Sequence, residues 1–193
     1  MIEELELRRY VGEAARGHRA TVAEIYRTSY VEAVASGEPF HSVDAFMERF
    51  DTYATIEGFD MLIAYLGGEP VGQTWGWPLA ADTRWWDGLL APLPAELTRE
   101  DGHRTFALSE IMVRADLTGR GIAHHLHDTL LDGRAEERAT LLVEPDNTTA
   151  YRAYLRWGWE KVGQLRPSWP DAPVWDVLLV PLGRLQGDDP RAA

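Results

Sequence analysis

The sequence predicts a single α/β domain built around a mixed β-sheet, and three observations support that prediction. The chain has 193 residues, which suits one domain with a sizeable core. Its composition is that of a globular protein, with 45% hydrophobic and 26% charged residues. Strand and helix periodicities alternate along the chain, as they do in α/β proteins. We expect the domain to cover residues 1–182 and residues 183–193 to form a frayed tail.

The first half predicts a strand, helices and a hairpin. Ser42 is placed to cap a helix, and the Gly67-Gly68 pair is placed to turn a hairpin. The predicted elements are, in order, a strand over 5–10, helices over 18–35 and 42–50, and hairpin strands over 60–66 and 71–77.

A long connection over residues 79–104 follows, with weak periodicity and several prolines. Such a segment is typical of a functional or mobile loop, or of a surface insertion with a small helix. Trp85 and Trp86 are hard to bury there, so they suggest a substrate lid or part of a homodimer interface.

The second half predicts alternating strands and helices. Alternation indicates strands, and apolar residues spaced three and four apart indicate helices. The predicted elements are strands over 105–113, 139–143, 159–165 and 174–180, and helices over 121–133 and 147–157.

Charge and residue usage exclude several classes of function. The absence of cysteine excludes disulfides, cysteine metal sites and a cysteine nucleophile. The net charge of −12 disfavours nucleic acid and attracts a cationic small molecule or a basic peptide, although it also simply favours solubility. No apolar run approaches membrane-spanning length, and residues 1–6 do not resemble a signal peptide. We expect a cytoplasmic protein.

Residues 117–126, LTGRGIAHHL, place two glycines at the start of a helix. Ile122, Leu126 and Leu130 form the buried stripe of that helix. The first four backbone N–H groups of a helix have no partner within it, and glycines let an anion approach them. The loop therefore predicts either an anion site or a tight strand-to-helix turn. It is neither a P-loop nor a dinucleotide fingerprint.

Two motifs resemble the GNAT acetyltransferases. Strand 108–113 followed by 118–123 resembles their motif A, Gln/Arg-x-x-Gly-x-Gly/Ala, with Thr118 where the family prefers Gln or Arg. Downstream, Asn147-x-x-Ala-x-x-x-Tyr154-x-x-x-Gly-Trp159 resembles their motif B, with Trp159 in place of Phe. On helix pattern alone, Tyr154 is equally typical of a buried core tyrosine.

The resemblance implies a mostly antiparallel, twisted sheet of about six to seven strands flanked by helices, as layered α/β folds have. It also implies that acetyl-CoA is the co-substrate, with its pyrophosphate on the glycine loop and its pantetheine on the strand. Tyr154 would protonate the departing thiolate. The implied cofactor-binding residues are Ile111, Met112, Val113, Thr118, Gly119, Arg120, Gly121, Ile122, Ala123, Asn147 and Tyr154.

Glu110 is the candidate general base, because it lies on the strand beside the expected thioester, among apolar neighbours. Burial there would raise the pKa of the carboxyl group. The alternative is a structural salt bridge to an arginine. Without cysteine, direct attack by the amine is the expected mechanism.

The acceptor is expected to be a small-molecule amine, with a protein or peptide amine as the alternative. Trp75 and Trp77 are expected either in the core or in a substrate pocket wall. A non-catalytic acyl-CoA sensor and an unrelated anion-binding protein are the other hypotheses. No metal is expected, since Asp128 is predicted to point away from His124 and His127, which are read as helix-surface histidines.

Overall fold

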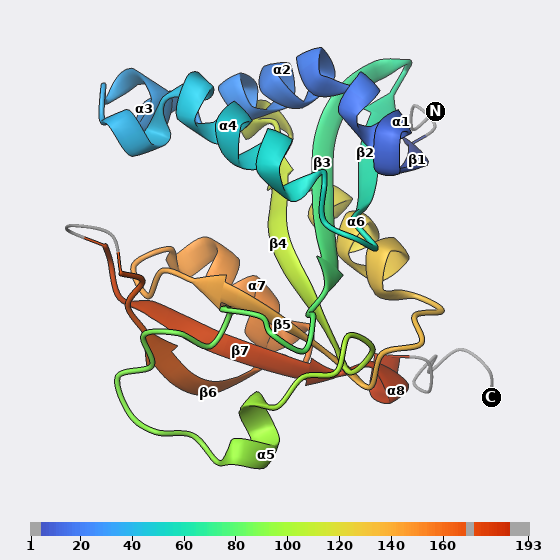
Figure 1. Ribbon diagram of the computed structural model, residues 1–193. Helices are drawn as coiled ribbons and strands as arrows, with labels where there is room; N and C mark the ends of the chain where they lie inside the picture. Colours follow the sequence, from blue (N-terminus) through green and yellow to red (C-terminus); the bar gives the residue numbers. More distant parts are fainter. Residues whose placement is uncertain (1–4, 169–171, 186–193) are drawn as a thin grey trace. The chain divides into compact units, whose positions relative to one another are not determined.

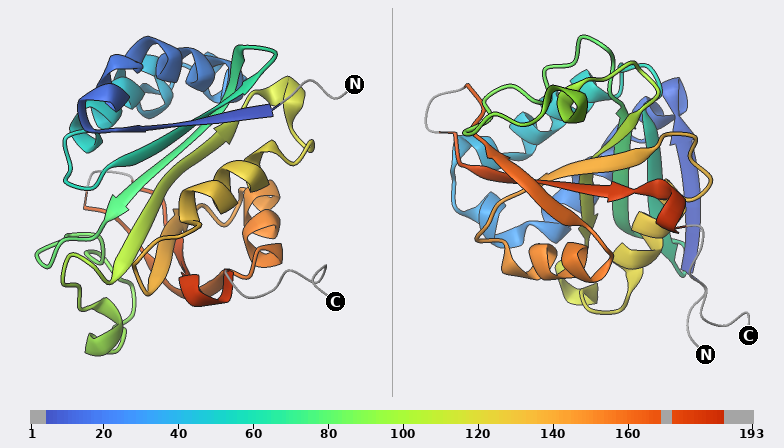
Figure 2. Two further views of the ribbon diagram at one scale, coloured as in Figure 1. Left: turned by 90° about the vertical axis from the view of Figure 1, so that its right-hand side faces the viewer. Right: turned by 90° about the horizontal axis from the view of Figure 1, so that it is seen from below.

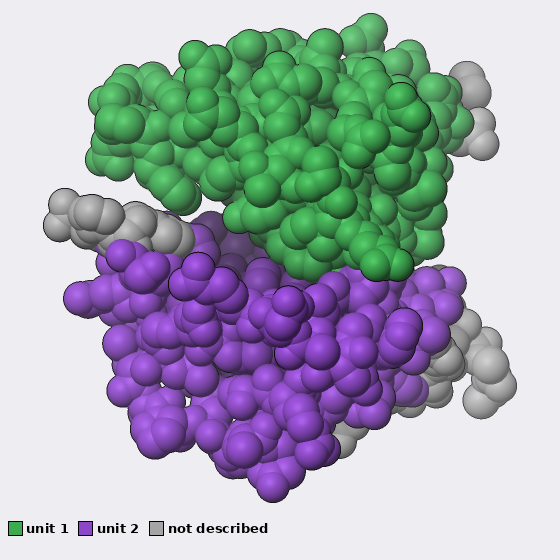
Figure 3. Space-filling view, in the orientation of Figure 1, with its two compact units in different colours: residues 1–77, 109–131 green, residues 78–108, 132–193 purple. Residues whose placement is uncertain are grey.

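The computed structural model describes residues 5–168 and 172–185 (Figure 1). Contacts divide the chain into two compact units (Figure 3). Unit 1 comprises residues 1–77 and 109–131, and unit 2 comprises residues 78–108 and 132–193. The helices are α1 (Gly12–Gly17), α2 (Arg19–Ser29), α3 (Val31–Ala35), α4 (Val43–Tyr53), α5 (Ala95–Thr98), α6 (Ile122–Leu131), α7 (Thr148–Arg156) and α8 (Leu182–Leu185).

The strands form a seven-stranded sheet in the order β1-β2-β3-β4-β5-β7-β6. The pairs β1–β2, β2–β3, β5–β7 and β6–β7 are antiparallel, and β4 and β5 pair in parallel from residue 105 to 107. Residues 105–108 of β4 belong to unit 2 and residues 109–113 to unit 1. The strands are β1 (Leu5–Val11), β2 (Asp60–Leu66), β3 (Glu69–Pro78), β4 (Thr105–Val113), β5 (Arg138–Val143), β6 (Glu160–Leu165) and β7 (Trp175–Pro181). The predicted mixed, mostly antiparallel sheet is therefore confirmed.

Within unit 1, helices cover both faces of the β1-β2-β3 sheet (Figure 2). Gln73 on β3 donates from Nε2 to the carbonyl of Val22 on α2 at 3.2 Å. The next residue toward the N-terminus, Gly72, faces the opposite side, where a Cβ would lie 3.2 Å from Leu126 of α6 and 2.9 Å from the Met112 carbonyl oxygen. Glycine is required at residue 72 because the neighbouring strand and helix approach so closely.

The core of unit 1 is largely aromatic between α4 and β3. Trp75 is 1% exposed, and its ring centroid lies 5.3 Å from that of Phe50 and 5.6 Å from that of Phe46. Phe46 in turn stacks on Tyr26 at 3.8 Å. Such rings bury a large apolar area and pack with defined geometry, so they fix α2 and α4 against the strand.

Within unit 2, α7 packs on one face of β6 and β7. The Tyr151 hydroxyl donates to Asp176 at 2.9 Å, and Asp176 also accepts from Gln164 at 2.8 Å and pairs with Lys161 at 2.8 Å. Burial alone would raise the pKa of the Asp176 carboxyl, but these partners, Lys161 above all, outweigh it and lower the pKa. The buried carboxylate thereby ties α7 and β6 to β7.

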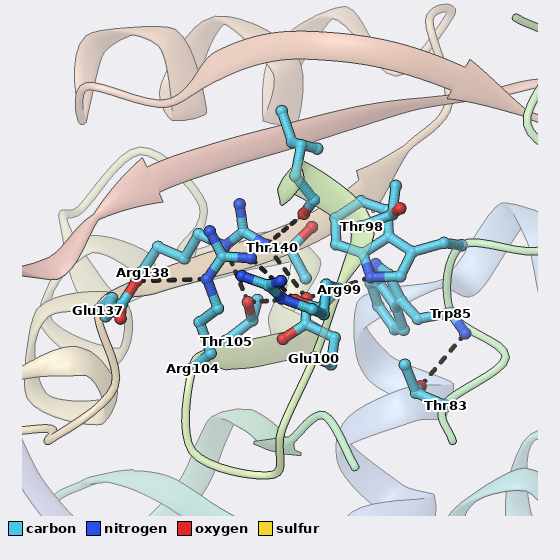
Figure 4. A network of polar contacts seen from close by, with 12 residues as sticks. Thr83, Trp85, Thr98, Arg99, Glu100, Arg104, Thr105, Glu137, Arg138 and Thr140 are labelled. Carbon is cyan, nitrogen blue, oxygen red and sulfur yellow. Dashed lines mark hydrogen bonds and ion pairs between the residues drawn. The ribbon is translucent and has the colours of Figure 1, made fainter. Parts of the chain in front are cut away.

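The long segment 79–104 is held by a buried polar network (Figure 4). Glu100 Oε1 accepts from Trp86 Nε1 at 3.1 Å and from Thr105 at 2.9 Å, and it pairs with Arg138 at 3.1 Å. Trp86 is only 9% exposed. The expectation that both tryptophans are hard to bury is therefore wrong for Trp86, because its indole N–H finds a carboxylate partner.

Most predicted elements are present within a few residues of their expected bounds. The predicted helix over 18–35 is wrong in detail, because the chain leaves helical geometry at Tyr30 and splits into α2 and α3. The frayed tail predicted over residues 183–193 stays a prediction, and its first three residues, 183–185, belong to α8. Residues 186–193 lie outside the described part of the chain.

Candidate functional site

The glycine loop of unit 1 turns the chain from β4 into α6. Gly119 has φ +77° and Gly121 has φ +82°, values that L-residues with side chains rarely adopt. The first hydrogen bond of the helix runs from the His125 N–H to the Gly121 carbonyl at 3.1 Å. The N–H groups that precede His125 in the first turn therefore have no partner within the helix and are directed outward from its start. Backbone conformation makes this turn suited to an anion.

The side chains around the loop contribute less to a possible anion site than the loop's backbone does. The Thr118 hydroxyl donates to the Ala115 carbonyl at 3.0 Å, so it stabilises its own turn. Arg114 pairs with Asp116 at 2.7 Å. Arg120 is exposed, and Ile122 is buried at 5% exposed, so Ile122 could contact a ligand only through its backbone.

In the second half of β4, the backbone N–H and carbonyl groups of successive residues point alternately toward β3 and away from it. The Arg114 N–H donates to the Val71 carbonyl at 2.9 Å. Since N–H groups alternate along an antiparallel strand, Ile111 and Val113 direct theirs away from β3. Met112 is buried and directs its carbonyl toward Gly72. Of the three strand residues predicted to bind the cofactor, Ile111 and Val113 are therefore on the edge that β3 leaves free, whereas the Met112 backbone faces β3.

Glu110 precedes this edge and is half-buried. Burial raises the pKa of its carboxyl to about 7, and the Arg49 guanidinium opposes that rise. Its backbone carbonyl accepts a hydrogen bond from the Thr74 hydroxyl at 2.7 Å, which fixes the strand at this point. The prediction of a raised pKa from an apolar setting is confirmed. Among the described residues, Glu110 makes no ion pair with an arginine.

Two tyrosines share the electrostatic environment of Glu110. Burial and the Glu110 carboxylate both raise the pKa of Tyr26 on α2 and of Tyr53 on α4, and Arg49 opposes the rise at both. Arg49 lies 4.3 Å over the Phe40 ring and donates to the Phe40 carbonyl at 3.2 Å. Glu110, Arg49 and the two tyrosines therefore influence one another electrostatically, and we call this set the acceptor cluster.

Trp75 and Trp77 lie on β3 in unit 1. Both are buried, at 1% and 8% exposed, as their core interpretation predicts. Tyr53 packs against Trp77 with centroids 4.7 Å apart. The Nε1 of Trp75 is buried, and no described residue accepts a hydrogen bond from it. An unsatisfied buried donor of this kind is uncommon and calls for a polar partner.

Unit 2 carries the two residues of the second motif. Asn147 caps α7, accepting from the Ala150 N–H at 3.3 Å, as predicted. Tyr154 is 7% exposed, and its ring packs edge-on against Trp157 at 5.7 Å and Trp159 at 6.0 Å. This packing fixes the ring of Tyr154. Its role as an acid stays a prediction, as does a ligand contact by Asn147.

Sequence reasoning missed Arg49, Tyr26 and Tyr53. All three lie on amphipathic helices and read as ordinary surface or core residues. Only the long-range pairing of β3 with β4 brings Glu110 to them. The expectation that Asp128 points away from the histidines is wrong, since it contacts both His124 and His127.

Comparisons with known proteins agree with these features. The model of the family described as "Acetyltransferase (GNAT) family" matches residues 20–159. A search of curated proteins finds no match. Within residues 5–168 and 172–185, no helix has the length and apolar character that crossing a membrane requires.

Solved structures share the fold at low sequence identity. An acetyltransferase from Thermus thermophilus has a TM-score of 0.64 at 15% identity, covering 93% of this chain and 98% of that one. A variant of the spermidine N-acetyltransferase SpeG from Vibrio cholerae has 0.59 at 15% identity, covering 95% and 96%. The protein yncA from Salmonella typhimurium, solved with its cofactor acetyl-CoA, has 0.59 at 13% identity, covering 93% and 94%.

Proposed function

Because the chain belongs to the GNAT acetyltransferase family, we propose that it moves acetyl from acetyl-CoA to a small-molecule primary amine by direct attack. The observation that carries this proposal is Glu110, a half-buried carboxyl group with a pKa of about 7 on the strand that leads into the glycine loop. A base with a pKa near the working pH is what amine acylation requires.

The glycine loop fits the pyrophosphate of the co-substrate. Backbone N–H groups from Thr118 to Ala123 would bind it, each donor to a charged group contributing about 1.5–3 kcal/mol. The helix dipole of α6 adds about 0.3–1 kcal/mol. Ile111 and Val113 would bind the pantetheine through their backbone and polarise the acetyl carbonyl. These local donors would offset the repulsion that a net charge of −12 exerts on a polyanion.

Glu110 would take the proton that the acceptor must lose. A lysine-like amine with a pKa of about 10.4 is neutral in only about one molecule in 2,500 at pH 7. Glu110 accepts that proton directly or through one water, and the freed nitrogen attacks the acetyl carbonyl carbon. The carbon–sulfur bond then breaks, and Tyr154 gives a proton to the departing thiolate. The acylated nitrogen loses its second proton to the resulting tyrosinate, directly or through water, which restores Tyr154, and Glu110 releases its proton to solvent. The products are an acetamide and the free thiol.

The acceptor cluster indicates which class of amine would serve as the acetyl acceptor. Glu110 would receive the ammonium group, while the Arg49 guanidinium favours an oxygen-bearing or anionic group on the same molecule. A polyamine would instead place further positive charge near Arg49. SpeG is named for spermidine, so a polyamine remains the contrasting candidate.

The test is thiol release from acetyl-CoA with matched pairs of amines. Each pair consists of an α-amino acid and the amine that lacks its carboxylate, with spermidine and a lysine peptide added. We expect turnover with at least one small amine, and a preference for the member that carries the carboxylate. Silence across the panel, together with tight CoA binding, would favour an acyl-CoA sensor. Turnover of the peptide alone would favour a protein acetyltransferase.

A further inference from the structure

Three metal-ligating side chains meet on α6 in unit 1. His124, His127 and Asp128 are spaced i, i+3 and i+4, so they share one side of the helix. His127 Nδ1 lies 2.8 Å from Asp128 Oδ1, and His124 Nε2 lies 3.3 Å from Asp128 Oδ2. One ligand atom from each residue lies within 4.8 Å of the others. The carboxylate therefore bridges two imidazoles.

These spacings are close to those of a bound ion. Zinc holds imidazole nitrogen and carboxylate oxygen at about 2.0–2.2 Å in tetrahedral geometry, which puts neighbouring ligand atoms about 3.3 Å apart. The distance from His124 Nε2 to Asp128 Oδ2, 3.3 Å, matches that value, and the distance from His127 Nδ1 to Asp128 Oδ1, 2.8 Å, is shorter. Small rotations of the side chains, mainly ones that bring the two imidazoles closer together, would complete the ligand geometry of such an ion.

Burial and charge also suit a cation. The His127 side chain is fully buried, so one ligand is held in place by the core. The His124 and Asp128 side chains are 52% and 55% exposed, which leaves access for an ion and for water as a fourth ligand. One carboxylate with two imidazoles is a ligand set typical of zinc and its neighbours rather than of calcium or magnesium.

We propose that His124, His127 and Asp128 form a binding site for a divalent transition-metal ion such as Zn²⁺ on α6. The site stands apart from acetyl transfer, since it rests on none of the residues assigned to the acyl or amine groups. The ordinary alternative is that Asp128 only accepts hydrogen bonds from the two histidines.

The experiment uses the untagged full-length chain after dialysis against a chelator. Co²⁺ is added and its visible absorption is followed, and Zn²⁺ binding is measured by calorimetry. We expect one equivalent to bind, with the intense visible bands of a low-coordinate cobalt site. Bound Zn²⁺ should also raise the melting temperature, because it binds the folded state.

Asp128→Asn and His124→Gln test the ligands. Each should weaken Zn²⁺ binding at least about tenfold, which is about 1.4 kcal/mol. His125→Gln is the matched control, because His125 is an exposed histidine of the same helix outside the cluster, and it should leave binding unchanged. Circular dichroism without metal checks that each variant folds. The proposal is overturned if the wild type takes up no stoichiometric ion, or if the control weakens binding as much as the ligand variants do.

Discussion

The Arg49 guanidinium opposes the rise in the pKa of Glu110 that burial causes, although the two side chains form no ion pair in the described structure. Replacing the cation with an uncharged side chain of similar length, as in Arg49→Met, should raise that pKa above about 7. Since the base works only when deprotonated, the rising limb of kcat/KM against pH should move to higher pH. Arg27→Met, which removes an exposed arginine paired with Glu24, should leave the profile in place.

Glu110→Gln should lower activity and raise stability at the same time. Loss of the base should reduce kcat/KM about a hundredfold or more. The pKa of Glu110 in the folded state, about 7, lies above its ordinary 4.5, so ionisation at high pH destabilises the fold. Removing the carboxylate should therefore add at most about 3 kcal/mol at pH 8.5 and little at pH 4.5. Urea denaturation at the two pH values measures this, and equal gains at both would contradict it.

Tyr154→Phe should separate chemistry from binding. The ring keeps its contacts with Trp157 and Trp159, so the fold and CoA affinity should change little. The missing hydroxyl should lower kcat about a hundredfold if it protonates the thiolate. Unchanged turnover would show that Tyr154 is only a core residue.

Gly121→Ala should disturb the loop through its backbone alone. No atom lies within 4 Å of the added Cβ, so the cost comes from φ +82°, about 1–2 kcal/mol for an L-residue. We expect weaker CoA binding and a lower melting temperature. Gly17→Ala is the control: Gly17 lies in α1 and also faces open space, without a positive φ, so alanine should stabilise it by about 0.5–1 kcal/mol.

Glu100→Ala should destabilise the protein strongly. It leaves Arg138, whose side chain is 12% exposed, without its carboxylate partner, and it removes the acceptor for Trp86. Breaking a buried pair in this way costs about 3–5 kcal/mol. Glu100→Gln keeps an acceptor oxygen and should cost less. Thermal denaturation of both variants measures the difference.

The sequence was informative where local chemistry decides the structure. Ser42 and Asn147 cap their helices as predicted, because side-chain caps act over three residues. It was uninformative where distant segments meet. Glu110 and Arg49 are far apart in sequence, and nothing in their neighbours indicates that they share a cluster. The helix break at Tyr30 also carried no proline or glycine signal.

The same limit explains the errors at Asp128 and Trp86. Periodicity gives the direction of a Cβ, but an aspartate can reach histidines one and four residues away through its rotamer. Trp86 looked hard to bury because its partner Glu100 lies 14 residues along an irregular segment.

The order of the chain through the two units has a consequence for synthesis. Residues 78–108 of unit 2 interrupt unit 1, and β4 runs from one unit into the other without a break. During synthesis, unit 1 is therefore complete only after residue 131 has left the ribosome. A fragment that ends at residue 77 would lack β4 and α6. We expect neither unit to be expressible by simple truncation, and folding to wait on contacts between distant parts of the chain.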